Sequence, residues 1–307
     1  NKISLCQRKA NGESRVTILN IDGTVANIVQ QPSIISFPRK AIVAGADTWI
    51  ADQLGGLSQF NTTSFEQYKP NSPGGIATGE ATVSNQSVYA TAGGVDQLWN
   101  PMNNTDGIYI FKEGTWTTID DSNYRQLDTL LDFISLAVDP KDETIWAGSY
   151  GGGLLHVKAH QSLEIFKQNF LSPTIIDPSS YRVAGLAFDR ENNLWISNYG
   201  AAQPLVVKKS DATVTKFSIP FPLIENQLAQ VVVDDNNYKW VIAPKSGGLI
   251  CFDHGTAIEN TGDDRWKIFK GGAGNGNLPN DNVLSITKDK NGFIWVGTTN
   301  GIGVVQC

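Results

Sequence analysis

The sequence is poor in cysteine, histidine and positive charge. Its 307 residues include three cysteines and three histidines, and 24 Lys and Arg against 30 Asp and Glu give a net charge of −6. Nucleic-acid-binding proteins usually carry a basic stripe, and this sequence has none, so we expect no nucleic-acid partner. Three cysteines do not make a disulfide framework. We therefore expect buried thiols at Cys6, Cys251 and Cys307.

Long apolar runs are also missing. No stretch approaches the roughly 20 residues that a membrane-spanning helix needs, and no signal peptide is present. The composition, 40% hydrophobic and 18% charged, is that of a globular protein. The chain starts at Asn1 and ends after a strand-like segment. We interpret residues 1–307 as one domain taken from a longer protein.

A repeat centred on tryptophan runs through the chain. Short segments of similar sequence surround five tryptophans, Trp49, Trp146, Trp195, Trp240 and Trp295. The last four are separated by 49, 45 and 55 residues, and Tyr89 takes the same position in a sixth copy. Self-similarity at such a period is the signature of a repeat architecture.

Each copy predicts four strands. An alternating apolar segment ends in an aspartate about six residues before the tryptophan, at Asp139, Asp189, Asp234 and Asp289. A polar hairpin turn, the tryptophan strand, a glycine turn, a third strand and an outer aromatic strand complete the unit. Because these residues recur in successive copies, we expect structural roles: the aspartates accept hydrogen bonds in the turn, and the tryptophans pack between adjacent sheets.

Four antiparallel strands in each 40–50 residues predict an all-β fold, a β-propeller. Five complete blades are expected at 33–75, 76–125, 126–180, 181–226 and 227–280. Residues 281–307 supply three more strands and residues 1–32 two or three. We expect strands from both termini to close the ring, giving six or seven blades. Closure would bring the chain ends together, which keeps a Cys6–Cys307 disulfide open as an alternative.

The copy at 278–302 resembles the two-component-regulator propeller repeat. The resemblance rests on Leu278-Pro-Asn, the Asp289-Lys-Asn-Gly turn, Ile294-Trp-Val-Gly-Thr and Gly301-Ile. Rings of this family commonly have seven blades, which favours seven here. The resemblance implies a periplasmic or cell-surface location in a bacterium. Two settings fit: the sensor ectodomain of a hybrid two-component system, and the PorZ-like propeller component of type IX secretion.

An insertion at 93–105 breaks the repeat and carries the strongest candidate for binding. Trp99 and Asn100 lie in this long polar loop, where an exposed aromatic is costly without a function. The competing interpretation is that Trp99 folds back and plugs one face of the ring. Tyr150 and Tyr199 occupy equivalent turns after the tryptophan strand, and we expect them to share a pocket on one face.

No pattern in the sequence predicts catalysis, a metal or a cofactor. His156 and His160 flank a hairpin turn, but no third ligand follows at metal-binding spacing. We therefore predict a non-enzymatic binding or scaffold propeller whose partner is a glycan, a peptide or a neighbouring envelope protein domain. Two alternatives stay open: a carbohydrate-active hydrolase or lyase on a propeller frame, and a purely structural spacer ring.

Overall fold

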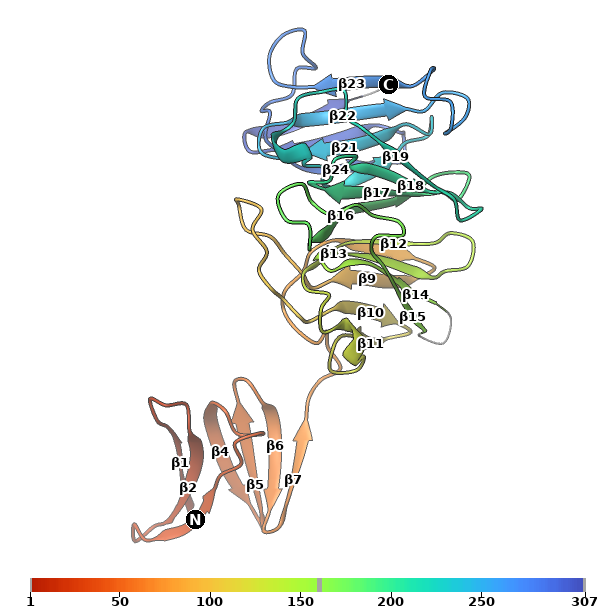
Figure 1. Ribbon diagram of the computed structural model, residues 1–307. Coiled ribbons are helices and arrows are strands. Elements are labelled where there is room, and N and C mark those ends of the chain that lie inside the picture. The colour runs from red at the N-terminus through yellow and green to blue at the C-terminus, as the bar shows by residue number, and fades with distance from the viewer. Residues whose placement is uncertain (1, 159–161, 306–307) are drawn as a thin grey trace. The chain divides into compact units, whose positions relative to one another are not determined.

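The computed structural model describes residues 2–158 and 162–305, which are almost all strands, turns and loops (Figure 1). The chain divides into two compact units, residues 1–72 and residues 73–307. The helical elements with defined bounds are two single turns, η1 (Arg125–Leu127) and η3 (Ile224–Asn226). Within the described residues, no helix has the length and apolar character needed to cross a bilayer.

Unit 1 consists of two antiparallel sheets. The first has three strands, β1 (Lys2–Arg8), β2 (Ser14–Asn20) and β3 (Val25–Val29). The second has four, β4 (Pro38–Ala44), β5 (Asp47–Asp52), β6 (Gly56–Asn61) and β7 (Ser64–Tyr68). Val16 and Ile18 of β2 share a buried core with Ile50 of β5. On the same β5 strand, the half-buried Trp49 stacks on Tyr68, with ring centroids 5.6 Å apart.

Unit 2 contains five antiparallel blades, each named here by its first strand. The β8 blade has strands β8 (Ala81–Ser84), β9 (Ser87–Thr91), β10 (Ile108–Lys112) and β11 (Thr115–Ile119). The β12 blade has β12 (Phe133–Val138), β13 (Ile145–Gly151), β14 (Gly153–Val157) and β15 (Leu163–Phe166). The β16 blade has β16 (Tyr181–Phe188), β17 (Leu194–Tyr199), β18 (Leu205–Lys208) and β19 (Val214–Phe217).

The remaining two blades complete unit 2. The β20 blade has β20 (Val231–Val233), β21 (Lys239–Ala243), β22 (Gly248–Asp253) and β23 (Arg265–Phe269), and the β24 blade has β24 (Val283–Lys288), β25 (Ile294–Thr298) and β26 (Gly301–Val305). Each blade pairs its strands in chain order, and a short pairing of β13 with β16 links two neighbouring blades. The predicted all-β fold with four-stranded antiparallel blades is confirmed.

Neighbouring blades of unit 2 bury their faces against each other. Four separate cores each combine residues of two consecutive blades, and the tryptophans of the repeat take part in three of them. Trp146 belongs to the core between the β12 and β16 blades, Trp195 to the next and Trp240 to the one after. All three are at most 4% exposed. Trp295, on the last blade of unit 2, is 43% exposed.

A hydrogen bond between aspartate and indole fixes three of these tryptophans. Asp234 accepts the Trp240 Nε1–H at 2.8 Å while its other oxygen accepts two backbone N–H groups of the turn. Asp189 with Trp195, and Asp289 with Trp295, repeat this arrangement. In all three copies the aspartate precedes the tryptophan by six residues. The carboxylate therefore closes the hairpin turn and accepts the indole N–H, which in the buried Trp195 and Trp240 would otherwise be an unpaired donor.

The β12 blade departs from this pattern because its turn is one residue longer. Asp139 precedes Trp146 by seven residues. It accepts the Lys141 N–H and the Asn192 side chain of the neighbouring blade, and the buried Trp146 Nε1 has no hydrogen-bond partner among the described residues. His156 covers the indole instead, with ring centroids 3.8 Å apart. In the blade with the longer turn, the Trp146 indole therefore has a stacking contact with His156 in place of the hydrogen bond to aspartate.

Replacing the aspartate should therefore cost more in the β20 blade than in the β12 blade. We expect Asp234→Ala to lower the free energy of unfolding by roughly 2–3 kcal/mol, since it removes a charged acceptor and leaves a buried indole N–H unpaired. Asp139→Ala should cost about 1 kcal/mol, because no indole depends on it. Urea denaturation of both variants measures the difference, and equal losses would contradict this role of the aspartate.

Candidate functional site

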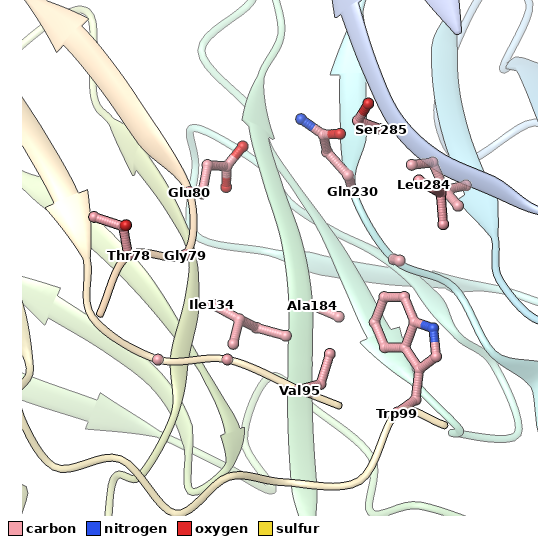
Figure 2. A pocket seen from close by; sticks show the side chains of 14 residues that line it. Thr78, Gly79, Glu80, Val95, Trp99, Ile134, Ala184, Gln230, Leu284 and Ser285 are labelled. Atoms are coloured by element: carbon pink, nitrogen blue, oxygen red, sulfur yellow. The ribbon is translucent and has the colours of Figure 1, made fainter. Parts of the chain in front are cut away.

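A cavity of about 350 Å³ lies where the five blades of unit 2 meet (Figure 2). Residues at or just before the first strand of every blade contribute to its wall, together with the 93–99 part of the insertion and Ile242 of β21. The blade residues are Thr78, Gly79, Glu80, Ile134, Ala184, Ala229, Gln230, Leu284 and Ser285. Most of this wall is apolar, with a few polar groups, which is the usual composition of a small-molecule site.

Three of the polar side chains in the wall, those of Glu80, Gln230 and Ser285, come from one position of the repeat. In each blade, one residue of the first strand pairs with the central aromatic, which is Tyr89 or a tryptophan of the repeat. The residue two positions before this pairing partner is Glu80, Ser135, Gly185, Gln230 and Ser285 in the five blades. No side chain fits at Gly185, where a Cβ would lie 2.3 Å from the Ala229 carbonyl oxygen. Only Glu80 and Gln230 carry long side chains at this position, and both line the cavity.

Glu80 and Gln230 make the same contact with the next blade. Glu80 Oε2 accepts the backbone N–H of Leu136 at 2.9 Å, and Gln230 Oε1 accepts that of Ile286 at 2.9 Å. Each N–H follows a bulge in the first strand of its blade, and a bulge disrupts the ladder locally. Each side chain therefore binds its own blade to the next at a point where strand pairing is interrupted.

Among the residues that the structure describes, Glu80 is the only charged one in the cavity wall. Burial raises the pKa of its carboxyl group to about 7, against the opposing effect of hydrogen bonds from the Leu136 N–H and the Gln230 side chain. Among the described residues, Glu80 forms no ion pair. Near neutral pH the carboxyl group is therefore divided between its charged and neutral forms.

The residues predicted for binding cluster beside this cavity. The Trp99 ring stacks on Tyr199 with centroids 5.3 Å apart and lies 6.2 Å from the Tyr150 ring. The Tyr150 hydroxyl donates to the Trp99 carbonyl oxygen at 3.0 Å. Tyr150 and Tyr199 are only 3% and 2% exposed, whereas Trp99 is half-buried and lines the cavity. The tyrosines thus support the indole from behind.

Asn100 is exposed and holds the loop rather than facing the cavity. Its backbone N–H and its side chain both donate to the Asp96 carboxylate, at 2.8 and 2.9 Å. Trp99 itself has a φ of 65°, a conformation that non-glycine residues seldom adopt. Such strain concentrates at ligand sites and is sustained by surrounding contacts. Ligand binding by Trp99, Asn100, Tyr150 and Tyr199 remains a prediction.

The histidines and cysteines among the described residues lie away from the cavity. His156 stacks on Trp146, and burial lowers its pKa to about 4. His254 Nδ1 lies 2.8 Å from the ammonium group of the fully buried Lys239. Cys6 is half-buried and Cys251 buried, whereas His160 and Cys307 lie outside the described residues. In residues 2–158 and 162–305, no three His, Cys, Asp or Glu residues gather as a metal site would require.

The last copy of the repeat matches the model of a known propeller family. Residues 277–300 match the family model described as two component regulator propeller. The chain therefore carries a repeat of this family, and the resemblance predicted for 278–302 is confirmed. No curated protein matches the sequence.

Several solved structures share the fold. PorZ, described as an essential bacterial surface component of the type-IX secretion system of Porphyromonas gingivalis, superimposes with a TM-score of 0.69 at 19% identity, over 98% of this chain and 47% of PorZ. The extracellular domain of a putative hybrid two component system from B. thetaiotaomicron gives 0.56 at 15% identity, over 98% of this chain and 37% of that one. A streptogramin B lyase gives 0.54 at 14% identity, over 99% and 96% of the two chains.

These similarities show the β-propeller fold. The chain spans about half the length of PorZ and about two fifths of the two-component ectodomain. The lyase is matched over nearly its full length. At identities below 20%, shared architecture does not carry a ligand or a reaction from one protein to another.

The raised pKa of Glu80 predicts a stability difference that depends on pH. A carboxyl group whose pKa is higher in the folded state favours folding below its ordinary pKa, and this contribution is lost as the pH rises through the folded value of about 7. Glu80→Gln should match the wild type near pH 4.5 and exceed its stability by on the order of 2 kcal/mol at pH 8.

Thermal melts of both proteins at several pH values measure this difference. The exposed Glu113→Gln, which removes the same charge from a hairpin turn, is the control and should show no such trend. A stability difference for Glu80→Gln that is constant between pH 4.5 and 8 would show that the carboxyl group is not desolvated.

Proposed function

We propose that this chain is a non-enzymatic binding propeller of a bacterial cell-envelope protein, and that it takes its ligand in the cavity of unit 2. The observation that carries the proposal is the cavity wall, to which all five blades of unit 2 contribute. A site built on rigid strands keeps its shape without a ligand. The ligand is a glycan, a peptide or a segment of a neighbouring envelope domain.

The kind of repeat and the similar structures support an envelope location. The chain carries a two component regulator propeller repeat, and the structures that it resembles include a bacterial surface component and an extracellular domain. We propose a periplasmic or cell-surface location on this basis. Two settings fit this location: the ectodomain of a two-component sensor, and the type IX secretion system.

An enzymatic role is the second candidate, favoured by the similarity to a lyase and by one residue. A carboxyl group with a pKa near 7, as in Glu80, has the proton affinity of a general base. Glycoside hydrolysis, however, normally needs two carboxylates facing the scissile bond. The described wall of this cavity holds one carboxylate and no other titratable side chain, which favours binding over turnover.

Trp99 provides the test of this function. We expect Trp99→Ala to weaken the binding of the full chain to an array of bacterial surface glycans and envelope peptides by about tenfold or more, because an aromatic contact in the cavity is lost. The control is Trp116→Ala, which removes a half-buried tryptophan of the outer strand β11. Circular dichroism melts establish that both variants fold.

Two results would contradict the proposal. Equal binding by the wild type and a folded Trp99→Ala variant would remove the cavity from recognition. Mass spectrometry of the same array after incubation should show unchanged glycans and peptides, and a new product that Glu80→Gln abolishes would establish the enzymatic alternative.

A further inference from the structure

Glu80 has hydrogen-bond donors but no positively charged group beside it in the described wall of the cavity. Within the described residues, no Lys, Arg or His lines the wall, and no salt bridge includes Glu80. A carboxylate removed from water without a cation nearby is unfavourable. A positive group that enters the cavity would restore the lost solvation, so the wall is complementary to a cation.

Gln230 shows that the structural contact does not require this charge. At the equivalent repeat position it accepts a backbone N–H of the next blade at 2.9 Å, as Glu80 does. A neutral amide therefore satisfies the bulge of the β24 blade as well as a carboxylate satisfies that of the β12 blade. The blade contact accounts for a long side chain with an acceptor oxygen at position 80, and it leaves the negative charge unexplained.

The rest of the wall indicates an organic cation rather than a metal ion. Hard metal ions take about six oxygen ligands, whereas the polar side chains of this wall are those of Thr78, Glu80, Gln230 and Ser285. The indole of Trp99 and the apolar side chain of Ile134 face the same space (Figure 2). An ammonium ion needs few acceptors, and aromatic and apolar surfaces suit its carbon body.

We infer that the cavity of unit 2 binds a small organic ammonium ion, with its charged end hydrogen-bonded to Glu80 and its apolar body against Trp99 and Ile134. This inference rests on the proposed function, since it assigns a ligand class to the same cavity. A primary amine on a peptide or on an amino sugar is the kind of group that would fit.

Binding of such a ligand increases with pH. The carboxylate form of Glu80 is needed, and it becomes populated as the pH rises through about 7. An alkylammonium ion keeps its proton until about pH 10. In the described part of the chain, no titratable group from the 93–99 loop, β12, β16, β21 or β24 lines the cavity, so Glu80 sets the pH dependence there.

The experiment compares two probes of nearly the same shape, 3-phenylpropylammonium and the neutral 3-phenylpropan-1-ol. Isothermal titration of the full chain at pH 8 should give an affinity for the ammonium about tenfold or more above that for the alcohol. Lowering the pH to 5.5 should remove most of this advantage, and the affinity for the alcohol should change little.

Glu80→Gln isolates the charge because glutamine already makes the equivalent contact at position 230. The variant should bind both probes equally at pH 8, and Glu113→Gln should behave as the wild type. The double exchange Glu80→Gln with Gln230→Glu keeps the net charge and moves the carboxylate to the opposite partner of the pair. It should recover preference for the ammonium, which a loss caused by misfolding would not.

Equal affinity of the wild type for the two probes at pH 8 would overturn the inference, as would an ammonium preference that persists at pH 5.5 or survives Glu80→Gln. These wild-type measurements decide the question even if a variant fails to fold. Trp99-dependent binding of envelope glycans or peptides together with equal probe affinities would leave the proposed function standing and remove the ammonium class alone.

Discussion

Burial of both faces of each sheet is the constraint on which this structure depends. A four-stranded antiparallel sheet with apolar residues on both sides is stable only when neighbours cover it. In unit 2, each of the four cores draws residues from two consecutive blades, and Trp146, Trp195 and Trp240 fill three of these interfaces. The Asp–indole hydrogen bond allows a tryptophan to be buried in such an interface with its N–H satisfied. The recurring residues thus hold the blades together, and the sequences of the irregular segments can vary.

The cavity follows from the same packing. Blades that meet face to face bring their first strands together. The small side chain of Ala184 lines the part of that junction that stays open, whereas Gly185 lets the backbone of the next blade approach closely. At this position of the repeat the sequence varies between Gly, Ser, Gln and Glu. Variation there changes the polar groups of the cavity, while the four apolar cores between blades are built from other residues. Glu80 is the one charged outcome of that variation, and Trp99 reaches the same space from an insertion supported by Tyr150 and Tyr199.

Much of the fold could be predicted from sequence, because turn and strand residues recur in register with the tryptophans. All five predicted blades contain the strands expected of them, and residues 281–307 and 1–32 supply three strands each. The number of blades in the ring and its closure by both termini remain predictions. The sequence did not predict a role for Glu80 and Gln230. Alignment on tryptophan and aspartate fixes the end of the first strand, whereas these two residues lie just before its start. They contact bulges of the next blade, which no local sequence pattern marks. The clustering of Trp99 with two buried tyrosines also depends on contacts between blades, which single-strand patterns do not contain.

Recognition of a cation in the cavity depends most on one physical quantity, the ionisation of Glu80. Glutamate labelled with ¹³C at the side-chain carboxyl carbon reports it directly by NMR, and comparison with Glu80→Gln assigns the signal. We predict that one glutamate resonance titrates near pH 7, that it is missing in the variant, and that an ammonium ligand moves its midpoint to lower pH. Titration of the Glu80 signal at the ordinary value near 4.5 would show a solvated carboxylate and contradict a cavity built to receive a cation.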